Sequence, residues 1–483
     1  MLCVSLMPGT TDDAVAGLAD AAAVADMAEL RLDAMPEFDL ARILAHPPCP
    51  VIVTYRPKRE GGLYEGPEDQ RLATLRQAAR LGARYVDVEH DALASLGDVP
   101  PAQVIASYHN HAGTPADLAA IHARLARTGA AVAKVAVLAN HILDTAAVLR
   151  VLRDATAATI ALSMGPRGVL TRVLAPKFGG FLTYAAAGSG PDAAPGQVSA
   201  ADMRGLYHVD RIGPATEVYG VIADPVGHSL SPRIHNAAFA EIGYDAVYLP
   251  LWVEGDPAAF VRAFREFGFN GYSVTIPHKQ TVMAAADEIE PLARRIGAVN
   301  TLQRRPDGSL FATNTDWTAG LAAIEAVVGA DWLAGKQALV VGAGGVGRAM
   351  AFGLKERGAV VALADVDETR ARALADEVGI SVCPMAQVPG LACDVLLNCT
   401  PIGMHPKTDA SPVPAAMLRP GMVVYDAVYN PRRTRLLGEA QAAGCRTVAG
   451  IDHFVRQAVE QFELWTGAAA PVETMRRVVL EAL

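Results

Sequence analysis

Short apolar runs alternate with alanine-rich segments of helical periodicity over the first part of the chain. Runs that are apolar at nearly every position are typical of parallel strands buried on both faces. Eight strand–helix units in about 200 residues predict a TIM (β/α)8 barrel over residues 1–210, with functional groups at the C-terminal ends of its strands. The expected strands cover residues 2–6, 28–33, 50–56, 84–90, 103–109, 130–137, 158–164 and 180–186.

The pattern changes after a Gly-Pro pair at residues 213–214, and a new apolar run follows at residues 218–224. Further along, residues 336–358 contain a strand, the turn GAGGVG and an alanine-rich helix. In this context the glycines let a pyrophosphate approach a helix N-terminus, which is the fingerprint of a Rossmann nucleotide-binding domain. We place this domain at residues 319–452. The chain is therefore expected to be an α/β protein with a barrel first and a dinucleotide-binding unit second.

Composition narrows the range of functions. The 42 Lys and Arg residues against 51 Asp and Glu give a net charge of −9, which argues against nucleic acid or an anionic membrane as the main partner. An anionic substrate would need a local basic pocket. The six cysteines show no CxxC or Cys/His clustering, so we expect neither a metal site nor disulfides. Without an export signal or a membrane-length apolar stretch, we expect a cytoplasmic protein.

One predicted barrel strand contains a charge. Lys134 lies in AAVAKVAVLA, residues 130–139, where every other side chain is small or aliphatic. An ammonium group removed from water must find a partner or lose its proton, and a neutral lysine is a nucleophile for carbonyl carbon. On spacing alone, a lysine that extends its ammonium to solvent at a strand end fits equally well.

Other charged residues lie at the ends of neighbouring predicted strands. Glu29, Arg31 and Asp33 are spaced by two, so they point to one face of their strand, which in a barrel is the interior. A structural ion-pair network would also explain buried charges, but their convergence on one barrel mouth favours a functional site. The remaining strand-end charges are Arg56, Asp87, Glu89 and His109.

The motifs ELRLD, VTYRPKREGG, VDVEHD, ASYHN, AKVAV, SMGPRGVLTR and APGQ occur in the order found in type I 3-dehydroquinate dehydratases, which the first 205 residues or so resemble. The resemblance implies dehydration of 3-dehydroquinate to 3-dehydroshikimate through a Schiff base on Lys134, with His109 as general acid and base. An iminium acidifies the adjacent carbon, so an imidazole with a pKa of about 6.5 is a suitable base. One departure is AAPGQ at residues 193–197, where many family members have SAPGQ.

The same resemblance implies further substrate contacts. Arg172 would hold the substrate carboxylate in the bidentate manner that a guanidinium allows. Glu29 and Glu89 would either orient His109 or hold substrate hydroxyls. The other expected polar contacts are Arg31, Arg56 and Gln197.

Segments of the second half, DPVGHSLSPRIHN, GYSVTIPHK, GAVNTL and TNTDWTAG, resemble the substrate-binding domain of shikimate dehydrogenases, which we place at residues 216–318 with a closing helical part at 453–483. The resemblance implies a catalytic pair, Lys279 and Asp316, that moves the proton of a secondary alcohol. A helix cap at Ser231 and a surface charge at Lys279 are the alternatives. The substrate contacts that it implies are Ser229, Ser231, Thr275, Asn300, Tyr429 and Gln457.

A nicotinamide cofactor follows from the glycine-rich turn. Asp365 ends the next predicted strand, where an acid binds the ribose hydroxyls of NAD and repels the 2'-phosphate of NADP. NADP-dependent shikimate dehydrogenases commonly read NRT where residues 365–367 read DVD, so we predict NAD preference; NADP stays open if Arg370 or Arg372 reaches the phosphate. The expected cofactor contacts are Gly342, Ala343, Gly344, Gly345, Val346, Gly347, Asp365, Thr400 and Met404.

Together these features predict a bifunctional enzyme of the shikimate pathway, in which the barrel makes the 3-dehydroshikimate that the second half reduces. The small-molecule partners would be 3-dehydroquinate, 3-dehydroshikimate and shikimate. An alternative is quinate catabolism, in which the second half oxidises quinate. A more distant one is a quinate-sensing regulator without catalysis, as in fungal repressors that resemble these domains.

Overall fold

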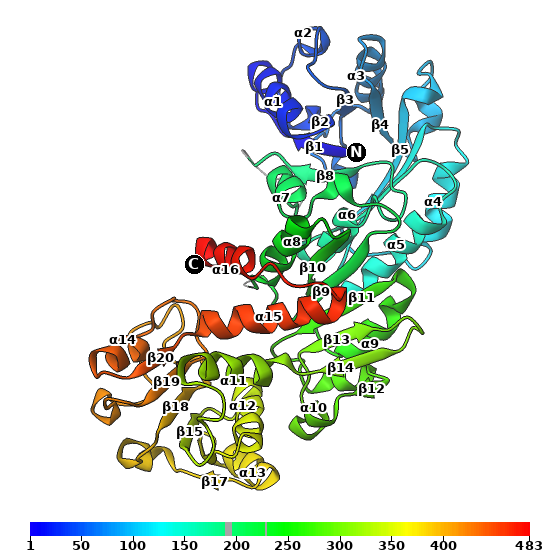
Figure 1. Cartoon of the computed structure of the whole chain (residues 1–483). Coiled ribbons are helices and arrows are strands. Elements are labelled where there is room, and N and C mark those ends of the chain that lie inside the picture. Colours follow the sequence, from blue (N-terminus) through cyan, green and yellow to red (C-terminus); the bar gives the residue numbers. More distant parts are fainter. Residues whose placement is uncertain (189–195, 228) are drawn as a thin grey trace.

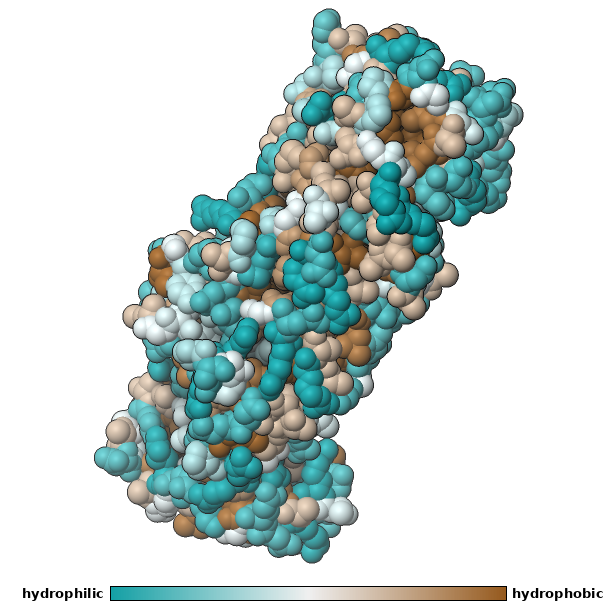
Figure 2. Space-filling view, turned by 90° about the vertical axis from the view of Figure 1, so that its right-hand side faces the viewer, coloured by the Kyte–Doolittle hydropathy of each residue, from teal (hydrophilic) through white to brown (hydrophobic). Residues whose placement is uncertain are grey.

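The computed structural model describes residues 1–188, 196–227 and 229–483. The chain forms three sheets that follow one another along an elongated molecule, with the barrel at one end and the third sheet at the other (Figure 1). Most of the face shown in Figure 2 is hydrophilic, and a hollowed apolar patch lies on the barrel end. Within the described residues, no helix is long and apolar enough to cross a membrane.

The first sheet has eight parallel strands in the order β7-β6-β5-β4-β3-β2-β1-β8. The edges meet where the Phe181 N–H donates to the Thr159 carbonyl at 2.8 Å, so the sheet is an almost closed barrel. The predicted TIM barrel is therefore confirmed. Its strands are β1 (Leu2–Leu6), β2 (Met27–Arg31), β3 (Val51–Thr54), β4 (Tyr85–Glu89), β5 (Val104–Asn110), β6 (Val132–Leu138), β7 (Thr159–Met164) and β8 (Thr183–Ala186).

Helices cover the outside of this barrel. The first follows a side-chain cap, because the Thr10 hydroxyl accepts the Asp13 N–H at 3.1 Å. The helices are α1 (Thr11–Val24), α2 (Leu40–Leu44), α3 (Glu68–Arg80), α4 (Leu118–Ala126), α5 (Thr145–Asp154), α6 (Val169–Val173) and α7 (Ala200–Gly205); a short 3-10 turn, η2 (Lys58–Glu60), follows β3.

The second sheet is mixed, in the order β10-β9-β11-β13-β14-β12. Two C-terminal helices pack on it with α8, so the end of the chain returns to this domain. Its strands are β9 (Glu217–Ala223), β10 (Ala246–Trp252), β11 (Phe269–Val274), β12 (Glu288–Ile289), β13 (Thr301–Arg304) and β14 (Leu310–Thr313). Its helices are α8 (Ser231–Ile242), α9 (Pro257–Phe264), α10 (Pro291–Ile296), α11 (Thr315–Val328), α15 (Gly450–Thr466) and α16 (Val472–Ala482).

The third sheet is parallel, in the order β17-β16-β15-β18-β19-β20. This is the strand order of a Rossmann fold, which places its ligand site at the carboxyl ends of the central strands. The strands are β15 (Gln337–Val341), β16 (Val360–Ala364), β17 (Ser381–Val382), β18 (Val395–Asn398), β19 (Val423–Asp426) and β20 (Arg446–Val448), with α12 (Gly345–Glu356), α13 (Glu368–Val378) and α14 (Arg435–Ala442). The boundaries proposed at 318 and 453 fall inside α11 and α15 and stay predictions.

The barrel and the second sheet contact each other through a loop beside the barrel site. Arg167, shortly after β7, pairs with Glu254 at 2.6 Å, and its guanidinium carbon lies 4.5 Å from the ring centre of Trp252. Phe178 and Phe267 pack edge to face with 5.9 Å between their ring centres. The two halves are thus in direct contact.

Candidate active sites

Lys134 lies in β6, and its ammonium group is inside the barrel. The side chain is buried, and Nζ donates to Asp87 at 2.8 Å, to Glu29 at 3.3 Å and to the Tyr184 hydroxyl at 3.1 Å. A lysine that extends to solvent is therefore not what this structure contains. Parallel pairing of β6 with β5 and β7 brings Lys134 to the level of Ser107 and holds it among carboxylates.

Three buried cations and three buried carboxylates form one connected cluster at this end of the barrel. Arg56 pairs with Asp87 at 2.9 Å and with Glu89 at 2.6 Å, and Arg71 pairs with Glu89 at 2.6 Å. Burial alone would raise the pKa of Asp87, but Arg56 and Lys134 together hold it well below its usual range. The cluster therefore sets three cationic side chains against three carboxylates.

Of the two roles expected for Glu29 and Glu89, orientation of His109 differs from what the structure shows, whereas contact with substrate hydroxyls stays a prediction. Among the described residues, Glu89 is completely buried, pairs only with arginines and does not line the cavity beside Lys134. Glu29 accepts from Ser5 at 2.7 Å, Thr54 at 2.8 Å and Lys134. Within the described residues, neither carboxylate bonds to His109, because the side chains just named hold both of them.

The residue that orients His109 is Glu60, which the pattern of strand ends did not indicate. Its carboxylate accepts the His109 backbone N–H at 3.2 Å and lies 3.0 Å from His109 Nδ1. Burial raises the pKa of Glu60 to about 8, although Arg56 opposes this. Burial, and then Arg56 and Lys134, lower the pKa of the His109 imidazole well below its ordinary value.

A tight turn places Glu60 over His109. Gly61 has a φ of 77°, in the left-handed region, and a Cβ there would lie 2.1 Å from His111 Nε2, so only glycine fits. Asp33 anchors the same loop by accepting the backbone N–H groups of Arg56 at 3.2 Å and Leu63 at 3.0 Å. In the sequence, the signal for Glu60 was the EGG triplet at the end of the motif VTYRPKREGG. This triplet lies beyond the end of its strand, β3.

A cavity of about 60 Å³ lies between Lys134, His109 and Arg172. Arg172 is 1% exposed, and its Nε and Nη2 atoms have no hydrogen-bond partner in the described part of the chain. Burial lowers its pKa to about 10. Gln197 Oε1 is also without a partner there. An unpaired buried guanidinium beside a cavity is a ready site for a carboxylate.

Two other features complete the barrel mouth. Arg31 lines the cavity and pairs with Asp33 at 2.7 Å. Residues 193–195 of the AAPGQ segment lie outside the described residues, so only its last two residues are placed.

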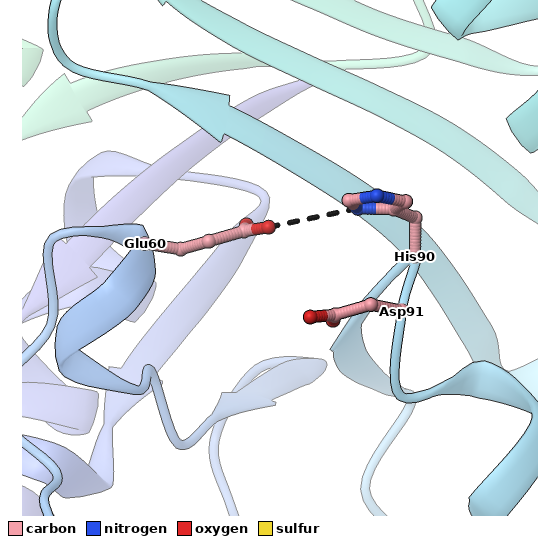
Figure 3. Close-up of side chains that lie close together, drawn as sticks. All are labelled: Glu60, His90 and Asp91. Carbon is pink, nitrogen blue, oxygen red and sulfur yellow. Dashed lines mark ion pairs between the residues drawn. The ribbon is translucent and has the colours of Figure 1, made fainter.

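Glu60, His90 and Asp91 bring three ligand-type atoms within 4.8 Å of one another (Figure 3). Both Asp91 oxygens already accept from Arg59, each at 3.0 Å, and Glu60 is committed to His109. His90 Nδ1 lies 3.6 Å from Glu60 Oε1, which is longer than a hydrogen bond, and we do not assign a metal to this group.

The second site lies between the second and third sheets. Lys279, in the loop after β11, donates to Asp316 in the first turn of α11 at 2.5 Å. Asn300 donates to the other carboxylate oxygen of Asp316 at 3.0 Å. Burial would raise the pKa of Asp316, but Lys279 and His453 hold it well below its usual range. Lys279 is thus paired and mostly buried, not a surface charge.

The expected substrate contacts come from several elements of the chain. Ser231 is the first residue of α8, and its N–H lies 3.3 Å from Ser229 Oγ, whereas the cap position is Leu230, so Ser231 is not a helix cap. Gln457, on α15, reaches the pair indirectly, since its carbonyl accepts from Thr315 at 3.3 Å. Tyr429 stacks on Phe454 of α15 at 4.7 Å. Thr275 follows β11 and leads to the loop of Lys279.

The glycine-rich turn between β15 and α12 is closely packed. A Cβ on Gly347 would lie 1.7 Å from the Gly342 carbonyl oxygen, and one on Gly345 would lie 3.3 Å from Lys279 Cδ. The turn therefore lies beside the Lys279–Asp316 pair. Ala343, Gly344 and Val346 belong to the same turn, while Thr400 lies next to Gly342 and Met404 is half exposed.

Asp365, at the end of β16, is tied to this turn. One oxygen accepts the Ala343 N–H at 2.6 Å, and the other accepts from Arg370 at 2.8 Å and from the Asp367 N–H at 2.9 Å. Burial would raise the pKa of Asp365, but these donors lower it. The neighbouring Val366 is 82% exposed. These residues thus fit a dinucleotide, because the glycine-rich turn supplies hydrogen-bond donors and an acid, Asp365, lies at the end of β16.

The fold and the two sites define a chain that joins a lysine-bearing barrel to a Rossmann dehydrogenase unit. The family model for type I 3-dehydroquinase matches residues 2–214, and that for the shikimate dehydrogenase substrate binding domain matches residues 221–302. The shikimate 5'-dehydrogenase C-terminal domain matches residues 450–480, and a model described as NADP oxidoreductase coenzyme F420-dependent matches residues 337–424.

A bifunctional 3-dehydroquinate dehydratase/shikimate dehydrogenase of Arabidopsis thaliana, described as chloroplastic, is 41% identical over 98% of this chain and 83% of its own length. The chain therefore belongs to the bifunctional 3-dehydroquinate dehydratase/shikimate dehydrogenase family. Among solved structures, shikimate 5-dehydrogenase of Thermus thermophilus with NADP(H) and shikimate is 36% identical with a TM-score of 0.51, over 56% of this chain and all of that one. Quinate dehydrogenase of Corynebacterium glutamicum with NAD is 31% identical with a TM-score of 0.52, over 55% of this chain and 99% of that one.

Proposed function

We propose that the chain catalyses two consecutive reactions: dehydration of 3-dehydroquinate to 3-dehydroshikimate in the barrel, and reduction of 3-dehydroshikimate to shikimate in the second unit. The observation that carries this proposal is the buried Lys134, paired with carboxylates, beside Arg172, for which the described residues supply no carboxylate. The chain is also related over both halves to a bifunctional enzyme. A regulator without catalysis has no need for these buried charges.

In the barrel reaction, the Lys134 amine attacks the substrate ketone and water leaves, which forms an iminium. His109 then removes a proton from the adjacent carbon and, as the acid, protonates the departing hydroxyl, which leaves as water. Hydrolysis of the product iminium breaks the C–N bond, releases 3-dehydroshikimate and restores the Lys134 amine. Glu60 faces Nδ1 of His109, so Nε2 is the nitrogen left for substrate. Arg172 would hold the carboxylate, and Gln197 and Arg31 lie at the same cavity.

In the second reaction, the nicotinamide cofactor supplies the hydride. Lys279 gives a proton to the oxygen of the forming alcohol, and Asp316 holds the ammonium in place. Asn300 fixes the carboxylate by bonding to its other oxygen. Ser229, Ser231, Thr275, Tyr429 and Gln457 are the proposed contacts to the substrate.

The barrel half is tested by borohydride trapping with 3-dehydroquinate, followed by mass spectrometry of the adduct. We expect a reduced adduct on Lys134 and none in Lys134→Met. An adduct on another lysine, or none in the wild-type chain, would refute the assignment. Shikimate-dependent reduction of a nicotinamide cofactor by the same preparation tests the second half.

NAD preference remains our proposal for the cofactor. Asp365 occupies the position where the ribose hydroxyls are bound, and its negative charge and the exposed Val366 offer nothing to a 2'-phosphate. Arg370 is paired with this acid instead of being free. Many relatives are named as NADP(+) enzymes, whereas the Corynebacterium glutamicum quinate dehydrogenase was solved with NAD. A kcat/KM tenfold higher with NADP than with NAD would refute the proposal.

The acid at position 365 also favours a second candidate, oxidation of quinate, since NAD usually serves oxidation. Parallel product analysis with quinate and shikimate separates the two substrates. A cytoplasmic location stays a prediction.

A further inference from the structure

A buried polar chain lies behind the Lys279–Asp316 pair, and the mechanism proposed for the dehydrogenase does not use it. His453, on α15, places Nε2 3.8 Å from Oδ1 of Asp316, the carboxylate oxygen that does not bond to Lys279. Its Nδ1 is hydrogen-bonded to the hydroxyl of Tyr425 on β19. Both side chains are buried. An apolar side chain would fill this space without the cost of burying polar atoms, so helix packing alone does not account for a histidine here.

We propose that His453 is a positioning residue for the dehydrogenase reaction. With Tyr425 behind it, the imidazole faces Oδ1 of Asp316 and keeps Oδ2 directed at the Lys279 ammonium. This inference rests on the proposed function, because Lys279 and Asp316 are taken as the pair that moves the proton of the alcohol.

The two contacts of His453 favour one tautomer of its neutral ring. The Asp316 carboxylate can only accept, which favours a proton on Nε2, the atom that faces it. Nδ1 then accepts from the Tyr425 hydroxyl, a group that can donate or accept. At 3.8 Å the contact is longer than a hydrogen bond, so the N–H dipole acts on the carboxylate by electrostatic attraction.

Protonation of His453 would alter this arrangement. An imidazolium places a second full cation against Asp316, which then competes with Lys279 for the carboxylate. We therefore expect dehydrogenase turnover to fall at acid pH, and we expect this acid limb of the pH profile to depend on His453. The other ionisable groups around the cluster are Lys279 in the loop after β11, Asp316 on α11, Cys399 after β18, Tyr425 and Asp426 on β19, and Glu460 on α15.

Glu460 is the main rival for such an acid limb. Burial raises its pKa to about 7, and it lies near Asp316 while its carboxylate accepts from Thr318. Glu460→Gln therefore serves as the control that removes this titration and leaves His453 in place.

The test compares the full-length wild-type chain with four variants, His453→Leu, His453→Gln, Tyr425→Phe and Glu460→Gln. For each protein, kcat and KM of both reactions are measured from about pH 5.5 to 8.5, the range in which histidine side chains ordinarily titrate. We expect His453→Leu to lower dehydrogenase kcat about tenfold with little change in KM, since misplacement of a catalytic group acts on the transition state. His453→Gln keeps an N–H donor near Nε2, so it recovers most of kcat and loses the acid limb. Tyr425→Phe lowers kcat, and Glu460→Gln keeps the limb.

Dehydratase kcat is the internal control for folding, because His453 lies outside the barrel. Wild-type kcat and an unchanged pH profile in His453→Leu would overturn the inference, as would loss of the acid limb in Glu460→Gln alone. If His453→Leu fails to fold, as an equal loss of both activities would reveal, the pH profiles of His453→Gln and Tyr425→Phe decide. Absence of shikimate-dependent turnover in the wild-type chain would instead refute the proposed function.

Discussion

Replacement of Arg172 by methionine should make the ligand-free barrel more stable and remove its affinity for substrate. Arg172 is 1% exposed, and burial lowers its pKa to about 10. Each pKa unit corresponds to about 1.4 kcal/mol, so the charge costs the folded state about 3 kcal/mol. Because the folded pKa lies below the unfolded one, this cost is fully present at pH 7 and is lost only as the pH rises above about 10.

Arg71 provides a matched control, since it is also completely buried but is paired with Glu68 at 2.7 Å and Glu89 at 2.6 Å. Removing one partner of a buried ion pair costs about 3–5 kcal/mol, so Arg71→Met should destabilise the barrel. Arg172→Met should stabilise it by about 1–3 kcal/mol, allowing for imperfect packing of the new side chain.

The assay is urea unfolding followed by hydrogen exchange of peptides from β4 to β6. Tryptophan fluorescence would not report on the barrel, because Trp252, Trp317, Trp332 and Trp465 all lie in the second half. Adding 3-dehydroshikimate should stabilise the wild-type barrel and not Arg172→Met, whose dehydratase kcat/KM should fall at least about 100-fold. A barrel that is less stable in Arg172→Met than in wild type, with ligand stabilisation intact, would refute the reasoning.

Three further outcomes are expected. Glu60→Gln should lower dehydratase kcat about tenfold to 100-fold, because it replaces the carboxyl group that lies against Nδ1 of His109, and steady-state kinetics will show this. Asp365→Asn should lower the ratio of kcat/KM for NAD to that for NADP about tenfold, because it removes a negative charge and releases Arg370; an unchanged ratio would count against the assignment. Asn300→Leu should lower dehydrogenase kcat/KM about tenfold through loss of a bond to Asp316, while dehydratase kinetics in the same sample stay at the wild-type level.

The barrel could be predicted because its strands are apolar on both faces and regularly spaced, and the Rossmann unit because its glycine turn follows a strand. The strand pattern also predicted that Lys134, Arg56 and Asp87 converge, because the parallel strands of a barrel all end at one mouth. The site roles themselves stay proposals.

The missed features depend on contacts between distant segments. Glu60 lies on a turn past a strand, so strand-end reasoning did not select it, and the glutamates chosen for its role are held by other partners instead. His453 sits on an amphipathic helix, where a histidine resembles an ordinary core residue. Its contact with Asp316 arises only because α15 packs along α11.

The carboxylates around Lys134 bear on the proposed Schiff-base chemistry. An iminium on Lys134 would carry its positive charge at the nitrogen that already bonds to Asp87 and Glu29, so these carboxylates would stabilise the covalent intermediate. The described residues supply no carboxylate to Arg172, and the carboxylate of a bound substrate would offset its charge. On the proposed mechanism, the charges of the barrel are therefore balanced for the covalent intermediate. In the proposed dehydrogenase reaction, Lys279 would form no bond to carbon, and Asp316 would direct its proton.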